Sequence, residues 1–465
     1  MAAVTLVLRD VELEGTRTAV EVHDGTVVRI GDDVVHRAGA LEIDGHGGAL
    51  LPGLHDHHLH LLSMAARTAS VDCTTTTREA DLVRAVRAVP GPWVRVTGYE
   101  ESLAGPLDRH VLDRWAPGRA VRVQHGSGAL WMLSTTALAQ VQHVLDDSAD
   151  VERDADGTPT GRLWRYDARL APALPPVPLD LGALGADLAR HGLTGATDAT
   201  PDIDPSGVRL LADAVDRGDL PLRVHLLGPS SAAAVPAGRG MTVGARKIVV
   251  EDHSLPDVGR LTAVIAGVHA TGRSVAVHTV SAESLVITVE ALRRAGSRRG
   301  DRLEHAAVVL PGLETDLRAL GVVVVTQPGF VHAHGDRYRR DVAPTDLPWL
   351  YRYATLRDHH VAVVASSDAP FGPVDPWQVM RAASTRRTRG GTVLGPGEAV
   401  PTAEVLDSYL RDPADLSRRR RVAVGGPADL CLLRVPLATA LAEPSAEHVR
   451  LTVTAAGSTE RVVGS

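Results

Sequence analysis

The chain has 465 residues, of which 44% are hydrophobic and 23% charged, so it can bury a large core and is neither disordered nor fibrous. Its formal net charge of -7 comes from intermixed acids and bases without a basic stripe, which excludes nucleic acid as an expected partner. The two cysteines, Cys73 and Cys431, lie outside any CxxC pattern, so we expect neither a disulfide framework nor a thiolate zinc site, and a reducing cytoplasm fits best.

Both ends of the chain carry the pattern of short antiparallel strands. Residues 4–50 alternate apolar and polar side chains between Gly and Asp turn signals, and residues 421–434 and 449–465 repeat this pattern. We therefore expect the two ends, 1–52 and 406–465, to pair into one small β-sandwich. The apolar run at the N-terminus ends after a few residues, which is too short for a signal-peptide core or a membrane span.

The part of the chain between these ends, residues 53–405, alternates short β-branched runs with helical stretches rich in Ala, Leu and Arg. This alternation is typical of βα units around a parallel sheet. Eight runs fit as strands, beginning with ALLPGLHDHHLH and continuing at 192–200, 222–228, 245–251, 274–278, 301–306, 322–328 and 361–368. The pattern predicts an α/β fold, a (β/α)8 TIM barrel.

One segment, residues 65–190, interrupts the repeat between the first and second strands. It has strand-like runs of its own and a Pro-rich stretch. Because long insertions in barrels lie in loops, and the active-site loops follow the strands, we expect an inserted cap subdomain over the barrel mouth. A purely structural embellishment is the alternative.

The first predicted strand ends in PGLHDHHLH, where His58 and His60 share one face because side chains alternate along a strand. In a barrel, this face points inward at the C-terminal rim, where catalytic residues lie. A lone HxH pair is weak evidence in a chain with 21 histidines. His55 with His57, and the HAH of 332–334, are alternative pairs.

The wider phrase favours the first pair. PGLxDxHxH after an N-terminal β-segment resembles the first-strand signature of the amidohydrolase superfamily, and His58 and His60 match its metal-binding histidines. Similar phrases of the YtcJ-like branch, amidohydrolase family 3, run almost from end to end. They include HGSGALWMLSTTAL (125–138), DGTPTGRL (156–163), VHATGRSVAVHTVSAESL (268–285), RLEHA, VTQP, SSDAP and GGPADL.

The resemblance implies further site residues. His278 ends the apolar strand SVAVH and His305 ends RLEHA, and the two match the family's third and fourth histidine ligands. Asp368 matches the aspartate that contacts the metal and takes a proton from metal-bound water. Lys247 resembles a lysine that can be carboxylated and bridge two metals, although the residues after it depart from the branch's VKxxxDG phrase. An ordinary strand-end lysine, or one that binds substrate, is the alternative.

Four histidines and one aspartate suit a divalent metal, with zinc expected first and iron, manganese or nickel as alternatives. The resemblance implies one or two ions, the second depending on carboxylated Lys247. Substrate contacts are expected from position alone, in the insertion and after the seventh strand, at Tyr99, Trp131, Trp164, Arg165, Gln327, His332 and His334. Taken singly, each of these is better explained by a structural role.

Together these features predict a metal-dependent amidohydrolase that hydrolyses an amide-type C–N bond of a small molecule. Metal-activated water would attack the carbonyl, and Asp368 would pass its proton to the leaving nitrogen. A cyclic-amide hydrolase and a deaminase are alternatives. The deaminase is the weaker of the two, because TVSAE after His278 lacks the closely spaced acid of the superfamily's mononuclear deaminases. A metal-binding regulatory protein without turnover is the alternative from another class, and a homodimer is one alternative for the assembly.

Overall fold

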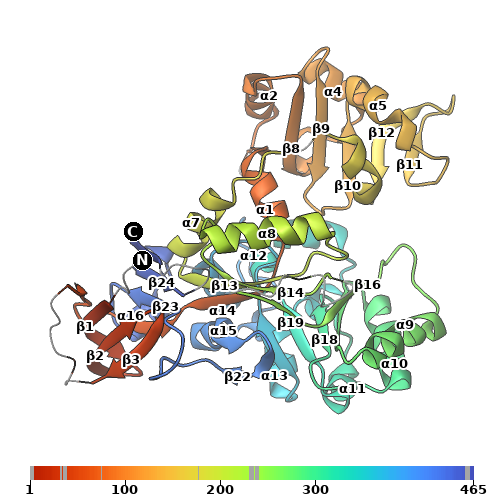
Figure 1. Cartoon of the computed structure of the whole chain (residues 1–465). Coiled ribbons are helices and arrows are strands. Elements are labelled where there is room, and N and C mark those ends of the chain that lie inside the picture. Colours follow the sequence, from red (N-terminus) through yellow and green to blue (C-terminus); the bar gives the residue numbers. More distant parts are fainter. Residues whose placement is uncertain are drawn as a thin grey trace. The chain divides into compact units, whose positions relative to one another are not determined.

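The computed structural model describes residues 5–31, 34, 39–74, 76–175, 177–229, 235, 240–455 and 461–464. The chain divides into two compact units, which we call unit 1 (Met1–Leu61 with Leu181–Ser465) and unit 2 (Leu62–Asp180). Figure 1 labels the elements of both units. Among the described residues, no helix is both long and apolar enough to cross a membrane.

Two four-stranded sheets of unit 1 are built from the ends of the chain. One has the order β3-β2-β1-β4, with β1 (Thr5–Leu13), β2 (Thr16–His23), β3 (Thr26–Ile30) and β4 (Leu41–Asp44). The other has the order β25-β24-β23-β5, with β5 (Leu50–Pro52), β23 (Leu430–Leu433), β24 (Val449–Thr454) and β25 (Arg461–Gly464). Leu8 of the first sheet and Leu430 of the second belong to one hydrophobic core. Of the ranges predicted as strands, residues 4, 32, 33, 35–38, 456–460 and 465 lie outside the described part of the chain.

Parallel strands form two further sheets of unit 1. The first has the order β15-β14-β13-β6, with β6 (Leu54–Leu59), β13 (Leu193–Asp198), β14 (Arg223–Leu226) and β15 (Met241–Val243). The second has the order β16-β17-β18-β19-β20, with β16 (Arg246–Val249), β17 (Val275–Thr279), β18 (Arg302–His305), β19 (Val323–Thr326) and β20 (Ala362–Ala365). The parallel pairing confirms the α/β class that the βα alternation predicts.

Backbone hydrogen bonds join the two parallel sheets at two places. Lys247 N, in the edge strand β16 of the second sheet, donates to Leu227 O at 2.9 Å, just after β14, which lies next to the edge strand β15 of the first sheet. At the other edge, Asp368 N donates to His58 O at 2.8 Å, three residues after β20 ends. The carboxyl ends of the first and last parallel strands are therefore neighbours.

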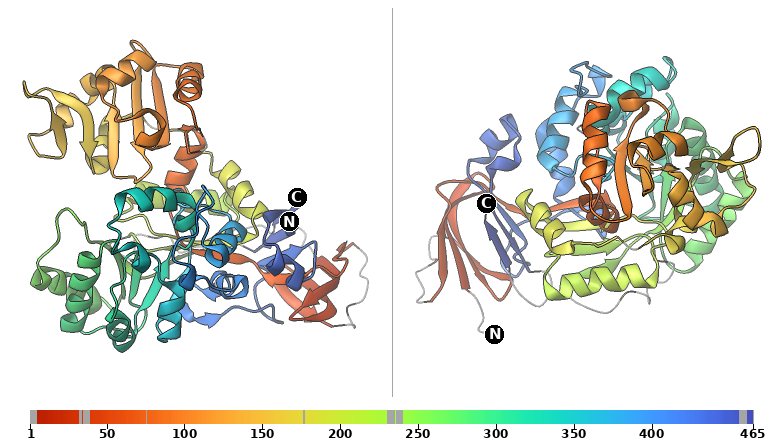
Figure 2. Two further views of the ribbon diagram at one scale, coloured as in Figure 1. Left: turned by 180° about the vertical axis from the view of Figure 1, so that it is seen from behind. Right: turned by 90° about the horizontal axis from the view of Figure 1, so that it is seen from above.

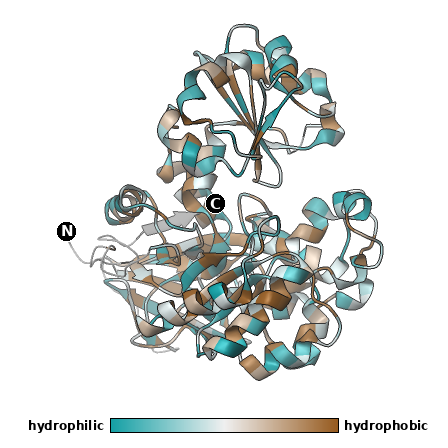
Figure 3. Ribbon diagram, turned by 90° about the vertical axis from the view of Figure 1, so that its right-hand side faces the viewer, coloured by the Kyte–Doolittle hydropathy of each residue, from teal (hydrophilic) through white to brown (hydrophobic). Residues whose placement is uncertain are grey.

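Helices alternate with these strands and cover them from outside (Figures 1 and 2). They include α7 (Leu181–Arg190), α8 (Pro205–Arg217), α9 (Val258–Ala270), α10 (Ala282–Ala295), α11 (Leu313–Leu320), α12 (Gly329–Asp341), α13 (Tyr353–Asp358), α14 (Pro376–Thr385) and α15 (Thr402–Tyr409). A further helix, α16 (Leu437–Ala442), follows β23 of the sheets built from the chain ends. Side-chain oxygens of Asp204, Asp257 and Ser281 accept backbone N–H groups where α8, α9 and α10 begin. Apolar side chains of α9, α10 and the strands share one core, and Figure 3 shows the hydrophobic residues concentrated there.

Unit 2 has its own six-stranded sheet of order β11-β12-β10-β9-β8-β7. Its strands are β7 (Val71–Asp72), β8 (Trp93–Tyr99), β9 (Ala120–His125), β10 (Leu130–Leu133), β11 (Val151–Arg153) and β12 (Pro159–Trp164). Its helices include α2 (Glu79–Ala88), α4 (Arg109–Trp115) and α5 (Thr135–Val141). Val121 and Ala120 are adjacent in β9 but belong to different cores, because successive side chains point to opposite faces. Unit 2 therefore has hydrophobic packing on both faces of its sheet.

Candidate metal centre

Three side chains meet where the first and last parallel strands of unit 1 end. His58 and His60 come from the end of β6, and Asp368 follows β20. The Nε2 atom of His60 lies 3.1 Å from Asp368 Oδ1, and the Nε2 atom of His58 lies 3.5 Å from the same oxygen. One ligand atom from each residue lies within 4.8 Å of the other two. This arrangement could hold one divalent ion between two nitrogens and a carboxylate oxygen.

Alternation along β6 sends its other histidines to different partners. The Nε2 atom of His55 lies 2.9 Å from Thr197 Oγ1, and that of His57 lies 3.0 Å from the carbonyl oxygen of Ser408 in α15. Both imidazoles are buried. Contacts with neighbouring elements thus explain why His55 and His57, the alternative HxH pair, are buried.

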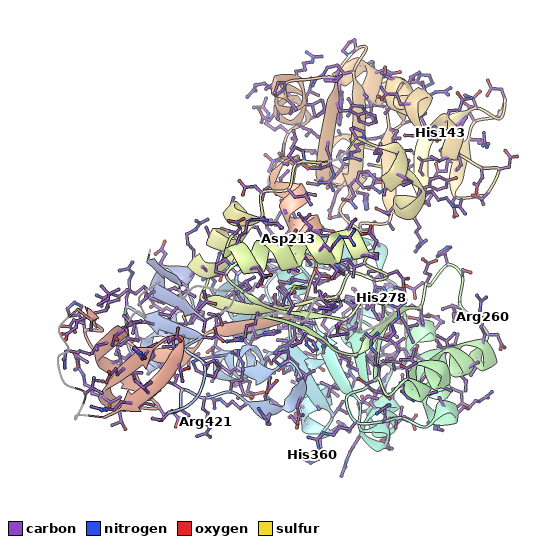
Figure 4. The ribbon with its side chains drawn as sticks, viewed as in Figure 1. His143, Asp213, Arg260, His278, His360 and Arg421 are labelled. Carbon is purple, nitrogen blue, oxygen red and sulfur yellow. The ribbon has the colours of Figure 1, made fainter. Side chains whose placement is uncertain are left out.

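Two more histidines continue the group along neighbouring strands. The ring of His305, at the end of β18, lies 4.8 Å from that of His58 and 4.5 Å from that of His278, measured between centroids. His278 lies near the end of β17, whereas His360, just before β20, lies at the opposite end of the strands (Figure 4). The structure therefore brings the four predicted histidine ligands together, while metal binding by each of them stays a prediction.

The second ring nitrogen of three of these histidines is held by a neighbour. The Nδ1 contacts are from His58 to the carboxylate of Glu304, from His60 to Thr200 Oγ1 at 3.2 Å, and from His305 to Gln327 Oε1 at 2.8 Å. Metal-binding histidines are commonly oriented in this way, because an acceptor on one nitrogen leaves the lone pair of the other for the ion. The donor set therefore fits a divalent metal.

The electrostatic environment keeps the imidazoles of His58 and His305 neutral. Burial, reinforced by the nearby Lys247, lowers the pKa of His58 well below its usual value. Burial and the neighbouring His278 do the same to the pKa of His305. Because only a neutral imidazole can ligate a metal, the shifts favour coordination at neutral pH.

Lys247 lies inside this group, in β16. Its side chain is buried, and its Nζ lies 3.4 Å from Nε2 of His58. Burial lowers the pKa of Lys247 to about 8, although the carboxylates of Glu304 and Asp368 oppose the shift. A substantial fraction of this amine is therefore neutral in mildly alkaline solution.

Two site residues have left-handed backbones. The φ angle is 69° at His305 and 53° at Asp368. This conformation costs a non-glycine residue roughly 1–3 kcal/mol and is concentrated at functional sites. The surrounding hydrogen bonds, including Asp368 N to His58 O, hold Asp368 in it.

Sequence analysis missed Glu304, the residue before His305. Arg302 contacts both of its carboxylate oxygens, with Nη2 to Oε2 at 3.0 Å, and also donates to His57 O at 2.7 Å. Burial opposes ionisation, but Arg302 and Lys247 outweigh it and lower the pKa of Glu304. The signal in the sequence was an acid inside a strand predicted at 301–306, since a carboxylate needs a partner when a strand is buried.

Two buried aspartates hold the backbone around the histidines and were also missed as site residues. Asp56 Oδ1 accepts from His58 N at 3.0 Å and from Ser367 N at 3.2 Å, and burial raises the pKa of Asp56 to about 6. Asp198 accepts from Leu61 N at 2.8 Å and from Thr200 N at 3.0 Å. These contacts link the end of β6 to β13 and to the segment after β20.

The predicted substrate contacts after strand seven have structural partners. Gln327 is fully buried and holds His305. His332 and His334 lie in the helix α12, so the alternation that places both histidines of an HxH pair on one face of a strand does not apply to them. The ring of His332 contacts the carbonyl oxygen of Arg387 at 3.2 Å, and the ring of His334 contacts the carbonyl oxygen of Phe371 at 2.8 Å. Contact of these side chains with substrate stays a prediction.

The predicted contacts of the insertion lie in unit 2, where its own residues bind the polar side-chain atoms of Tyr99, Trp131 and Trp164 and the backbone N–H of Arg165. Their bonds run from Tyr99 Oη to Gly105 O at 2.6 Å, from Trp131 Nε1 to Asp167 at 2.8 Å, from Trp164 Nε1 to Glu152 at 2.6 Å and from Arg165 N to Ala129 O at 2.7 Å. A structural role accounts for each of these contacts, and a role in substrate binding stays a prediction.

Comparison with known proteins points to one family. A model described as amidohydrolase family matches residues 41–456. The chain is 26% identical to YtcJ of Bacillus subtilis (strain 168), which is described as an amidohydrolase, over 90% of this chain and 91% of that protein. It is 27% identical to N-substituted formamide deformylase of Arthrobacter pascens, over 86% of each.

Solved structures share the fold. An uncharacterized metal-dependent hydrolase from Pyrococcus horikoshii has a TM-score of 0.73 at 17% identity, over 95% of this chain and 98% of that one. N-isopropylammelide isopropylaminohydrolase from Burkholderia multivorans has a TM-score of 0.54 at 16% identity, over 98% and 97%. These likenesses show an α/β fold of the metal-dependent hydrolase type.

Proposed function

The chain belongs to the amidohydrolase family and is a hydrolase of carbon–nitrogen bonds, and we propose that it cleaves an amide-type bond of a small molecule. The observation that carries this proposal is the position of Asp368, whose Oδ1 lies 3.1 and 3.5 Å from two histidine nitrogens. The formamide deformylase among its relatives supports an amide-type substrate. A cyclic amide is one form that such a substrate could take.

We infer that the two parallel sheets of unit 1 close into one (β/α)8 barrel, in which β15 and β16, separated only by Gly244 and Ala245, count as one of the eight strands. The hydrogen bonds from Lys247 N to Leu227 O and from Asp368 N to His58 O support this closure, because one connects β16 with the segment after β14 and the other connects the segment after β20 with β6. The sheets built from the chain ends share a core, which supports the small β-sandwich. Closure would bring strand ends that are distant in sequence to one rim.

We propose that His58, His60, His278, His305 and Asp368 hold a divalent metal, with zinc the best match to the nitrogen and oxygen ligands. Such an ion lowers the pKa of water toward ~7 and polarises a carbonyl oxygen. The neutral state of His58 and His305, and the neighbours on their Nδ1 atoms, support these roles.

In the proposed reaction, Asp368 moves a proton. The carboxylate, 6% exposed, takes a proton from the attacking water while the water oxygen bonds to the carbonyl carbon. Asp368 then gives this proton to the nitrogen as the C–N bond breaks. The products are a carboxylic acid and an amine, so atoms balance without another reactant.

Assays of the purified, metal-loaded protein test this proposal. The substrates are an N-formyl amide, an N-acetyl amide and a cyclic amide, with amine release measured for the first two and ring opening for the third. We expect turnover of at least one of them, and a loss of at least about a hundredfold in Asp368→Asn. Chelation should abolish the activity, and divalent metal should restore it.

Asp213→Asn is the matched control, because Asp213 is exposed on α8 and the change in charge is the same. It should keep the wild-type rate. Ammonia release from a cyclic amidine without amide hydrolysis would favour a deaminase instead. No turnover of any substrate, in protein that binds metal stoichiometrically, would favour the non-catalytic alternative.

We also propose that Lys247 carries a carbamate that bridges a second ion. Its burial and its partly neutral amine support this role, since the neutral amine is the nucleophilic form. Metal counted per chain, with and without bicarbonate, should rise from one toward two. One firmly bound metal in both conditions, together with an intact mass that shows no added carbon dioxide, would contradict the bridge.

A further inference from the structure

Gln327 connects the ends of three adjacent parallel strands. It directly follows β19, and its side chain is fully buried. Its Oε1 lies 2.8 Å from Nδ1 of His305, the last residue of β18. Its Nε2 lies 3.0 Å from Oγ of Ser366, the first residue after β20. Because β18, β19 and β20 are neighbours in one sheet, a single amide group links the strand of one predicted metal ligand to the two strands beside it.

The neighbours of this amide fix its orientation. Val325 O lies 3.3 Å from Nε2 of Gln327, and a carbonyl oxygen only accepts, so the atom that faces it is the amide nitrogen. The hydroxyl of Ser366 donates its own hydrogen to Thr326 O at 3.3 Å, so its oxygen accepts from the same amide nitrogen. A reversed amide would set two carbonyl oxygens against each other. The amide oxygen therefore faces His305.

This orientation decides the tautomer of His305. An amide oxygen only accepts, so Nδ1 of the neutral ring carries the hydrogen and Nε2 keeps its lone pair. Oδ2 of Asp368 lies 3.8 Å from the same Nδ1, which is too far for a hydrogen bond, but its negative charge favours the same tautomer. With the amide reversed, an N–H would point at Nδ1, and the ring hydrogen would occupy Nε2. Nε2 is therefore the nitrogen left for a metal.

The backbone at the end of β18 does not by itself set the direction of this ring. The φ angle is 69° at His305 and 43° at Ala306, so two successive residues leave the extended conformation. The alternation of side chains that orients a regular strand therefore does not extend to His305. Gln327 and Ser366 have no exposed surface, so they give the ring a fixed neighbour that water does not displace.

We propose that Gln327 is a positioning residue that holds His305 as the tautomer able to bind the metal. The inference rests on the proposed function, in which His305 is a metal ligand. Both hydrogens of the amide nitrogen are taken by Val325 O and Ser366 Oγ, so no N–H is left for a substrate. Gln327 therefore acts on the metal through the imidazole alone.

Replacing Gln327 with leucine tests the proposal. Gln327→Leu keeps a side chain of similar size but removes the acceptor, so the hydrogen of His305 can occupy either nitrogen. We expect the affinity for zinc, measured by competition with a chelator, to fall about tenfold, at the low end of the range for such residues because the acceptor is neutral. The visible d–d bands of the cobalt-loaded protein, which depend on the ligands of the ion, should change as well.

Gln142→Leu is the matched control, because it makes the same chemical change at an exposed position of unit 2. It should keep the wild-type affinity and cobalt spectrum. Gln327→Met also lacks the acceptor and serves if the leucine variant folds poorly, as judged by thermal unfolding of the metal-free protein. Affinity and cobalt spectrum unchanged in Gln327→Leu and Gln327→Met would overturn the inference, as would a fall in affinity that Gln142→Leu shares.

Failure of the proposed function gives a different result, because metal binding is measured without turnover. Protein that binds zinc but hydrolyses no amide would still support this role of Gln327 if Gln327→Leu weakens the binding. Wild-type protein that binds no divalent metal would overturn this inference and the proposed metal together.

Discussion

At the scale of single residues, a chain of contacts holds His58 in place. Arg302 contacts both oxygens of Glu304, and Glu304 contacts Nδ1 of His58. All three side chains are almost fully buried, so water competes little for these contacts. An ionised acceptor at Nδ1 makes the other nitrogen a better metal ligand. Glu304 is therefore a positioning residue for the proposed metal.

Replacing Glu304 with glutamine tests this role. Glu304→Gln keeps the shape of the side chain but removes its negative charge, so we expect metal affinity to fall by roughly 10–100-fold. Competition with a chelator measures the affinity. Thermal unfolding of the metal-free protein separates the effect from a loss of stability.

Glu447→Gln, at an exposed position, is the matched control and should bind metal as tightly as the wild type. Unchanged affinity in Glu304→Gln would contradict the positioning role. A fall in affinity that follows only from lost folding of the metal-free protein would contradict it as well.

At the scale of elements, Asp301 ties together the strands that carry His278 and His305. Its Oδ1 accepts from Val275 N, where β17 begins, at 2.9 Å, and lies 3.0 Å from Nε2 of His269 in α9. Its Oδ2 accepts from Arg298 N at 2.8 Å. Asp301 is fully buried, so water does not compete with these groups for its carboxylate oxygens.

Loss of these bonds should destabilise unit 1. We expect Asp301→Ala to lower the free energy of unfolding by about 3 kcal/mol, because it leaves the buried Val275 N–H and the partly buried Arg298 N–H without their acceptor. Asp301→Asn keeps one acceptor oxygen and should cost less. Urea denaturation of both variants measures the difference, and a loss below about 1 kcal/mol in the alanine variant would show that other groups satisfy these donors.

At the scale of the whole molecule, unit 2 contains the packing that an independent domain needs. One core includes Val96 and Leu112, and the other includes Leu133 and Val141, on opposite faces of the six-stranded sheet. These cores are formed by residues of Leu62–Asp180. Unit 2 should therefore fold without unit 1.

Expression of residues 62–180 alone tests this expectation. The fragment should show a cooperative urea transition by circular dichroism. Val96→Asp, which places a charge at a fully buried position, should abolish the transition in the same fragment. A broad, non-cooperative transition in the unmutated fragment would show that unit 2 depends on unit 1.

The sequence by itself determined the features that depend on local pattern. Alternation along PGLHDHHLH predicted that His58 and His60 share a face, and the βα repeat predicted the parallel strands that place His278 and His305 at strand ends. Its phrases also resembled the family that the comparison confirms over residues 41–456. The cytoplasmic location, the homodimer and the identity of the metal stay predictions.

Only the tertiary structure decided which distant side chains touch. Glu304 contacts His58 across 246 positions, and Asp368 contacts His60 across 308. For Asp368 the family resemblance supplied the link, whereas no local pattern pointed from Glu304 to His58. Periodicity tells which way a side chain points from its own element, but the packing of all elements decides what it meets there.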